Sequence, residues 1–321
     1  MKIFITGNLG FIGAHLSELL IDNGYTIVGF DKRQSSEKEK YKCIQGNILD
    51  SELLNSSISN DIDLIIHLAA EHEDNVHPES LYYDVNVRGT KNIIDACEIN
   101  NINRIIFTST IALYGLDLTD SNENSTPNPF NDYGDTKLQA EKVLIQWWKK
   151  EKNRSLFIIR PTAVFGERNR GNVFNLMKQI SNNRFIIVGN GKNKKSIAYV
   201  GHLIEFIACS MNNNGFHIVN YADKPDLTMN QLVTIIHKIL NKKEKRLSVP
   251  YWMGIIAGYT YDVLSFVLGK NFPITSIRIK KFCSNSIVNT NKLERYNIKP
   301  PIPLHSAIER TIRFEFDKKN E

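Results

Sequence analysis

The chain has 321 residues, of which 42% are hydrophobic and 23% are charged, a balance that is ordinary for a globular protein. Its length allows a large core, and no internal repeat, low-complexity tract or flexible linker divides it. The formal net charge of +6 favours anionic partners such as nucleotides. The positive excess is spread along the chain, however, and no aromatic-basic pattern predicts a nucleic-acid partner.

The first half of the chain alternates short apolar runs with helical patterns. Strands are expected at residues 2–6, 25–30, 64–70, 103–110 and 155–161. Helices are expected between them, at residues 12–24, 85–100 and 136–150. This alternation predicts right-handed βαβ units, and therefore an α/β fold with a Rossmann-type doubly wound parallel sheet.

The pattern changes after about residue 166. Residues 184–200 predict a strand, a turn and a second strand, and residues 215–223 predict another strand. Residues 228–240 predict an amphipathic helix. We therefore expect a Rossmann domain at residues 1–166, to which about 196–210 return, and a smaller α+β domain at 167–321.

Two further features bear on location. The four cysteines are far apart and form no CxxC pair, which disfavours a disulfide framework or a zinc site and predicts a reducing cytoplasm. The most apolar region, 249–269, contains Asp262 and several small or polar residues, so it is a poor membrane span. We expect a packed helix there, or a partly exposed helix at an oligomer interface.

The turn after the first strand, "TGNLGFIG", carries Gly7, Gly10 and Gly13. Glycines at these points allow a tight turn, a close backbone approach to a pyrophosphate and close packing of the following helix, whose N-terminus attracts phosphate. The second strand ends in Asp31, where an acid holds the adenosine ribose hydroxyls of a dinucleotide. A carboxylate there repels a 2′-phosphate, so NAD is favoured over NADP, although Lys32 and Arg33 follow at once.

The stretch "YGDTK" places Tyr133 four residues before Lys137 at the start of a long helical pattern. Positions i and i+4 share one helix face, so a phenol and an ammonium enter the same site. The ammonium favours the phenolate, which makes Tyr133 a candidate proton acceptor and donor. A hydroxyl cluster, Thr108 to Thr110, ends an earlier strand, at the edge where ligands bind in parallel sheets.

These residues resemble the extended short-chain dehydrogenase/reductase family, in its NAD-dependent sugar epimerase/dehydratase branch. The matching segments keep the family's order through the N-terminal half: "TGNLGFIG", Asp31, "GNILD" (46–50), "HLAA" (67–70), "NVRGT" (86–90), "FTSTIALYG" (107–115), "YGDTK" and "RPTAVFG" (160–166). The resemblance implies that residues 1–166 bind NAD and that residues 167–321 mainly bind a nucleotide sugar. It also implies a homodimer.

The resemblance assigns roles position by position. Thr110, Tyr133 and Lys137 correspond to the catalytic residues. The residues that correspond to the cofactor site are Gly7, Gly10, Phe11, Ile12, Gly13, Asp31, Lys32, Asn47, Ile48, Leu68, Ala69, Ala70, Asn86, Thr108, Tyr133, Lys137 and Pro161. Asn47 replaces the family's usual Asp.

The family shares hydride transfer between a sugar carbon and the nicotinamide, with proton transfer through the tyrosine. Dehydratases and decarboxylases of the family carry acidic residues just after the active-site Thr, whereas Thr110 is followed by "IALYG". Two activities remain: a nucleotide-sugar 4-epimerase with tightly held NAD, and a reductase of nucleotide 4-keto-6-deoxy sugars. Asp31 favours NAD, and so the epimerase.

Substrate-binding residues are expected in the second half and in one loop. By resemblance, Asn172 and Val173 hold the diphosphate-sugar, Arg278 is a second phosphate contact, and Lys195 stands where many relatives place an Arg before an Asp. A UDP-sugar is the expected partner. His72 lies in a polar loop, 71–80, that is expected over the sugar; its spacing fits no metal-ligand pattern. A non-catalytic cofactor sensor is disfavoured because Tyr133 and Lys137 are both present.

Overall fold

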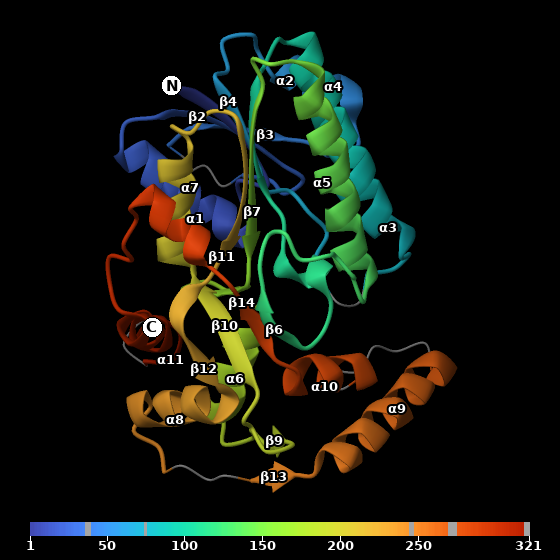
Figure 1. Ribbon diagram of the computed structural model, residues 1–321, viewed down its shortest axis with the longest axis vertical. Coiled ribbons are helices and arrows are strands. Elements are labelled where there is room, and N and C mark those ends of the chain that lie inside the picture. Colours follow the sequence, from blue (N-terminus) through green and yellow to red (C-terminus); the bar gives the residue numbers. More distant parts are fainter. Residues whose placement is uncertain (36–39, 74–75, 244–246, 269–274, 318–321) are drawn as a thin grey trace.

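The computed structural model describes residues 1–35, 40–73, 76–243, 247–268 and 275–317 of the chain. Seven parallel strands form the main sheet (Figure 1). Their order is β3 (Lys42–Gln45), β2 (Thr26–Asp31), β1 (Lys2–Thr6), β4 (Leu64–His67), β5 (Arg104–Thr108), β7 (Ser155–Pro161) and β11 (Phe216–Tyr221). The strand order reverses between β1 and β4, which places a topological switch point at their carboxyl ends.

The central strands are continuously apolar because helices cover both faces of the sheet. On one face α1 (Phe11–Asp22) packs against α7 (Val200–Ser210). On the other lie α2 (Ser51–Ser57), α4 (Gly89–Ile99) and α5 (Asp132–Lys150), whose Trp147 and Leu144 are fully buried. The predicted doubly wound α/β fold is confirmed.

A second, mixed sheet lies below the first in Figure 1. It contains β12 (Asp223–Thr228), β10 (Lys194–Tyr199), β14 (Ser286–Val288) and β6 (Leu118–Ser121), and β8 (Ala163–Phe165) also pairs with β10. The helices α6 (Asn172–Ser181), α8 (Met229–Ile239) and α11 (Leu304–Phe316) pack beside it. A short pair of strands, β9 (Ile187–Val188) and β13 (Ser248–Val249), leads into α9 (Tyr251–Leu268) and α10 (Ser276–Cys283).

The chain crosses between the two sheets more than once. β6 belongs to the second sheet although it lies within residues 1–166, and both α7 and β11 return to the first sheet from the C-terminal half. The expected return of about 196–210 falls partly on β10, which is in the second sheet, and partly on α7. The boundary near residue 166 stays a prediction.

A buried ion pair joins α5 to β7 of the main sheet. The carboxylate of Glu141, in α5, accepts two hydrogen bonds from the guanidinium of Arg160, in β7, at 2.9 and 2.5 Å. Arg160 also donates to the Tyr114 hydroxyl at 2.7 Å, and that hydroxyl donates to Asn220 of β11 at 2.8 Å. The ion pair raises the pKa of the Arg160 guanidinium. Because these groups are buried, each one depends on the others for its hydrogen bonds.

We predict that Glu141→Ala lowers the free energy of unfolding by about 3–5 kcal/mol, because it leaves the buried Arg160 charge without its partner. The matched control is Glu309→Ala, which removes an exposed i,i+4 ion pair with Arg313. We expect it to lower the free energy of unfolding by only about 0.5 kcal/mol. Urea unfolding of both variants measures the difference. Equal effects of the two substitutions would contradict the structural role of Glu141.

Candidate active site

The glycine turn between β1 and α1 forms a backbone cradle. Gly7 has φ +71°, and a Cβ there would lie 2.8 Å from the Ala69 nitrogen. A Cβ at Gly13 would lie 2.1 Å from the Gly7 oxygen, so α1 can only approach the turn this closely with glycine. The helix begins at Phe11 after Gly10, with no side-chain cap and no acid in its first turn. Its first N–H groups therefore remain available to an anion, as the pyrophosphate of NAD requires.

Asp31 closes the other side of this cradle. It is 6% exposed at the end of β2, and its carboxylate accepts hydrogen bonds from the Leu9 nitrogen at 3.0 Å and the Arg33 nitrogen at 2.9 Å. The carboxylate thus ties the glycine turn to the strand end. Lys32 pairs with Glu71 at 3.2 Å, and Arg33 pairs with Asp31 at 3.3 Å. Both cations that weaken the preference for NAD over NADP are therefore engaged by carboxylates.

The other predicted cofactor residues lie near the carboxyl ends of strands in the main sheet. Asn47 is exposed and accepts a hydrogen bond from the Leu49 nitrogen at 3.0 Å, while Ile48 is buried. Leu68, Ala69 and Ala70 follow β4 beside Gly7, and Pro161 ends β7. Their contacts with a cofactor stay predictions.

Asn86 occupies a π-helical turn, η1 (Asp84–Arg88), immediately before α4. It is buried, its side chain exchanges hydrogen bonds with the backbone of Glu71, and it donates to the Thr136 hydroxyl at 3.0 Å. Asn86 therefore joins the loop after β4 to the helix that carries the tyrosine. Single π-helical turns are often found at functional sites, and this one carries Asn86, a predicted cofactor residue.

A buried histidine that the sequence analysis did not single out supports the same edge. His67 ends β4, where Nδ1 lies 2.7 Å from the Thr6 hydroxyl and Nε2 lies 3.1 Å from the Thr90 hydroxyl. Burial lowers the pKa of His67 to about 3. The neutral ring therefore links β1, β4 and α4 as a structural residue. The matching segment "HLAA" (67–70) contains His67, but no local pattern could have identified its partners, because only the sheet brings them together.

Two of the three predicted catalytic residues, Thr110 and Tyr133, meet just beyond the carboxyl end of β5. Thr110 caps the short helix η2 (Ile111–Tyr114), and its hydroxyl accepts from the Ala112 nitrogen at 3.1 Å and also hydrogen-bonds Tyr133. Tyr133 lies in the first turn of α5, which is capped by Asn131. Lys137 is 2% exposed, with its Nζ 4.0 Å above the centre of the Phe107 ring. The predicted threonine and tyrosine are thus in contact, and Lys137 follows one turn later on α5.

Burial shifts both titrating groups toward their neutral forms. It raises the pKa of Tyr133 to about 12, against a smaller opposing effect of the Thr110 hydrogen bond. It lowers the pKa of Lys137 to about 7, against a smaller opposing effect of Glu141. A positive charge brought beside the phenol favours the phenolate. The proton affinity of Tyr133 therefore responds to the charge of a bound group, as reversible proton transfer requires.

The predicted substrate residues fall in separate places. Asn172 is exposed and Val173 buried at the start of α6, while His72 is exposed in the loop after β4. Arg278 lies on α10. The Lys195 ammonium donates to the carbonyls of Lys281 and Ser284 at 2.8 and 2.6 Å, and burial lowers its pKa to about 8. Lys195 thus holds the end of α10, and its role toward phosphate stays a prediction.

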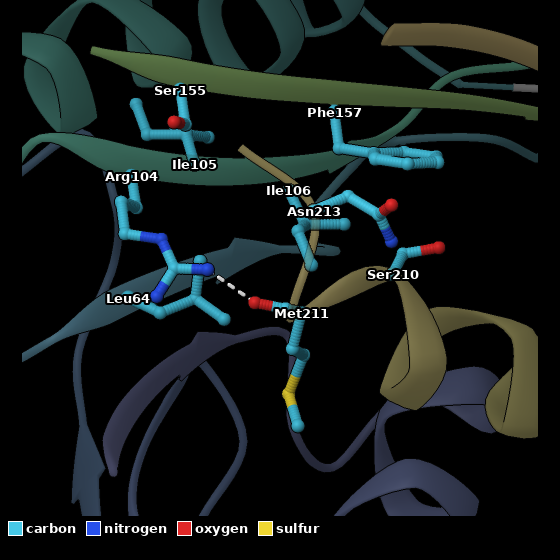
Figure 2. A pocket seen from close by; sticks show the side chains of 9 residues that line it. All are labelled: Leu64, Arg104, Ile105, Ile106, Ser155, Phe157, Ser210, Met211 and Asn213. Atoms are coloured by element: carbon cyan, nitrogen blue, oxygen red, sulfur yellow. Dashed lines mark hydrogen bonds between the residues drawn. The ribbon is translucent and has the colours of Figure 1, made fainter. Parts of the chain in front are cut away.

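A small pocket lies at the opposite, amino edge of the main sheet (Figure 2). The first residues of β4, β5 and β7 contribute to it, and the Arg104 guanidinium donates to the Met211 carbonyl across it. It is lined by Leu64, Arg104, Ile105, Ile106, Ser155, Phe157, Ser210, Met211 and Asn213. Ligands bind at the carboxyl ends of strands in such sheets, so this pocket is not the predicted site.

The comparisons with known proteins define the class. The model of the NAD dependent epimerase/dehydratase family matches residues 3–222. The chain belongs to this family and is an NAD-dependent enzyme, which confirms the predicted family and cofactor. Two solved structures share the fold: UDP-glucose 4-epimerase of Thermotoga maritima, with 20% identity and a TM-score of 0.79, and UDP-glucuronic acid 4-epimerase of Bacillus cereus, with 23% and 0.78. Each alignment covers 98% of both chains.

One relative is similar over nearly its whole length. It is N-acetyl-alpha-D-glucosaminyl-diphospho-ditrans,octacis-undecaprenol 4-epimerase of Escherichia coli O157:H7. The two chains are 44% identical over 318 residues, which cover 98% of this chain and 95% of the relative.

We predict that Lys137→Met loses catalysis but raises thermal stability at neutral pH. The folded pKa of Lys137 is about 7 and its ordinary value is 10.5, so below pH 7 the folded protein carries a buried charge at a cost. That cost falls as pH rises from 7 toward 10.5, since the folded protein then releases the proton before the unfolded chain does. The stability gain of the variant should therefore be largest at or below pH 7 and shrink at pH 9.5.

Thermal melts of dinucleotide-stripped protein at pH 6.5 and pH 9.5 measure this difference. Lys142→Met, at an exposed position of the same helix, is the control and should show no such pH dependence. A gain for Lys137→Met that grows with pH would contradict the assigned burial cost.

Proposed function

We propose that the chain is a 4-epimerase of a diphosphate-linked sugar that acts through a transient 4-keto sugar, and that the sugar is N-acetylglucosamine carried on a polyprenyl diphosphate. The observation that carries this proposal is the 44% identity, over nearly the whole chain, to an epimerase named for that substrate. The Thr110–Tyr133 contact and the buried Lys137 supply the required catalytic groups.

When bound, NAD accepts a hydride from the sugar carbon and returns it. The chain's own residues handle the proton. The Tyr133 oxygen takes the proton of the C4 hydroxyl as the C4–H bond is broken and returns it after the ketone presents its other face. The Thr110 hydroxyl hydrogen-bonds Tyr133 and holds the sugar oxygen near it. Lys137, one turn further along α5, supplies in its charged form the positive charge that favours the phenolate. The overall reaction inverts C4 without net oxidation.

The absence of an acid directly after Thr110 fits this chemistry. Elimination of water from the sugar needs an additional acid and base beside C5 and C6, whereas Ile111 and Ala112 follow here. Epimerisation needs only reversible proton and hydride transfer at C4. The sequence and the site therefore favour an epimerase over a dehydratase.

The group that carries the sugar diphosphate is either a nucleotide or a polyprenyl chain. The residues at positions 195 and 196, which differ from those of many family members, bear on this choice. Nucleotide-sugar members often carry an Arg–Asp pair where this chain has Lys195 and Ser196. Here the lysine ammonium is satisfied by two backbone carbonyls, and the serine hydroxyl donates to Asp226. Neither side chain offers the bidentate fork with which an arginine holds phosphate. This departure supports a polyprenyl carrier in place of the UDP expected from the resemblance. Cytoplasmic location and a homodimer belong to the same proposal.

We predict that Tyr133→Phe lowers kcat by about 10²- to 10⁴-fold, because it removes the group that transfers the proton. Bound NAD, measured in the supernatant after denaturation, should remain near the wild-type level. Tyr83→Phe is the matched control: Tyr83 is exposed and hydrogen-bonds Asp132 at 3.1 Å, so that variant should keep its turnover. Near-normal turnover by Tyr133→Phe would remove Tyr133 from the mechanism.

The choice of carrier is tested with two substrates that share one sugar. Undecaprenyl-diphosphate N-acetylglucosamine in detergent and UDP-N-acetylglucosamine are each incubated with the enzyme, and the released sugars are analysed for inversion at C4. We expect inversion of the lipid-linked sugar without added cofactor, at a kcat/KM at least about tenfold higher than for the UDP-sugar. Preference for the UDP-sugar would return the assignment to a nucleotide-sugar epimerase. Oxidation of added NADH by a 4-keto-6-deoxy sugar, without epimerisation, would indicate a reductase.

A further inference from the structure

The helix α9 exposes large apolar side chains that a helix at a protein surface normally buries. Nine of the seventeen large apolar side chains that are exposed in the described residues lie on this one helix. Trp252, Ile256, Tyr259, Val263 and Val267 follow one another at intervals of three or four residues, so they form a single stripe along about 22 Å of helix. Trp252 is 61% exposed and Val267 is 70% exposed. We call these five residues the apolar stripe.

The opposite side of α9 carries its small and charged residues. A Cβ at Gly254 would lie 2.4 Å from a Val188 methyl, and one at Gly258 would lie 2.7 Å from the Ser276 backbone. Asp262 accepts a hydrogen bond from the Ser276 nitrogen at 3.3 Å, at the start of α10. The one charged residue of α9 thus faces the protein, whereas a surface helix in water has the reverse arrangement.

A hydroxyl beside the stripe, that of Thr260, is also satisfied internally. The Thr260 hydroxyl donates to the Ile256 carbonyl at 3.0 Å, so it needs no water. Such back-bonding is how hydroxyls are accommodated on apolar helices in lipid. An exposed, contiguous apolar surface marks an interaction site.

Charge distinguishes a lipid surface from a protein partner. The neighbouring α10 contains Arg278, Lys280 and Lys281 and no acidic residue. The Lys280 ammonium lies 3.2 Å from the Tyr259 hydroxyl, so a positive charge stands at the border of the apolar stripe. Together, α9 and α10 carry three basic residues and the inward-facing Asp262. An apolar stripe with Trp and Tyr, bordered by basic residues, fits an anionic bilayer surface.

The helix pair α9 and α10 lies close to the segment that leads into the catalytic helix α5. Figure 1 shows α9 at the edge of the molecule, with α10 packed beside it. The Lys281 ammonium lies 5.3 Å from the centre of the Phe130 ring, and Phe130 is three residues before Tyr133. The same helix pair therefore borders both the apolar stripe and the segment that leads into the catalytic helix. No helix in the described ranges is long and apolar enough to cross a bilayer.

We propose that α9 lies in the interface of an anionic membrane leaflet and holds the active site at the lipid surface. There the sugar diphosphate of a polyprenyl carrier reaches Tyr133 while its hydrocarbon chain stays in the bilayer. The identity of the lipid substrate rests on the proposed function; the contact with the membrane rests on α9 and α10 alone.

Flotation of the full-length enzyme with vesicles of phosphatidylcholine and 30% phosphatidylglycerol tests the contact. We expect the wild type to float, and the double variant Val263→Glu with Val267→Glu to lose at least about tenfold in apparent affinity. Ile99→Glu, at another exposed apolar position, is the control and should float normally. Lys280→Gln should weaken binding about fivefold on anionic vesicles and little on pure phosphatidylcholine.

Trp252 gives a second readout on unsubstituted protein. Its fluorescence should shift to shorter wavelength when vesicles are added, and Trp252→Phe should abolish the shift. No flotation and no shift by the wild type would overturn the proposal. A wild-type dimer in light scattering that the Val263→Glu, Val267→Glu variant loses, without vesicle binding by either, would show that α9 faces a second copy of the chain.

Activity separates this inference from the proposed function. The double variant should epimerise a water-soluble, short-chain prenyl diphosphate N-acetylglucosamine like the wild type, but lose turnover of the undecaprenyl substrate in vesicles. Equal turnover of both substrates by both proteins would overturn the membrane role and leave the epimerase intact. If the wild type floats but inverts neither substrate, the proposed function fails and the membrane contact stands.

Discussion

The bidentate ion pair between Glu141 and Arg160 is the constraint on which the arrangement of the site depends. It joins α5 to β7 inside the protein, and Arg160 continues through Tyr114 to Asn220 of β11. The Asn220 nitrogen donates to Glu123 at 2.8 Å, just after β6 of the second sheet. One network thus fixes α5, η2, both sheets and the relative position of Thr110 and Tyr133. A buried charge that is fully paired specifies one geometry, since any shift would leave part of it without a partner.

This rigid support explains how the site holds a lysine in an unfavourable environment. Burial lowers the pKa of Lys137, which costs folding stability at neutral pH, whereas the raised pKa of Tyr133 costs nothing there because the phenol is neutral in both the folded and the unfolded chain. The same burial removes water that would otherwise screen the charge of a bound cofactor. Stability is therefore exchanged for a phenol whose proton affinity is controlled by its immediate neighbours.

The sequence was informative where chemistry depends on residues close together in the chain. The glycine turn, Asp31, the Thr108–Thr110 cluster and the Tyr133–Lys137 spacing are local, so their strand-end and helix-start positions followed from pattern alone. His67 and its two threonine partners come from β1, β4 and α4, and no local pattern joins them.

Long-range placement and surface orientation needed the three-dimensional structure. β6, from the N-terminal half, joins the second sheet, and β11, from the C-terminal half, joins the main sheet. Both placements depend on pairing with strands that are distant in sequence. For α9, composition indicated an apolar helix that was packed or partly exposed. Only the contacts of Gly254, Gly258 and Asp262 show which side faces the protein, and therefore that the large side chains face outward.

The central claim is that C4 of the sugar is oxidised and reduced within one closed site. The most direct measurement uses undecaprenyl-diphosphate N-acetylglucosamine with deuterium at C4, incubated with the enzyme in ordinary water without added cofactor. The account predicts C4-inverted product that retains the deuterium, because the hydride removed from C4 is the one returned to it. Inverted product that has lost deuterium to solvent, or no inversion while deuterium remains in place, would contradict it.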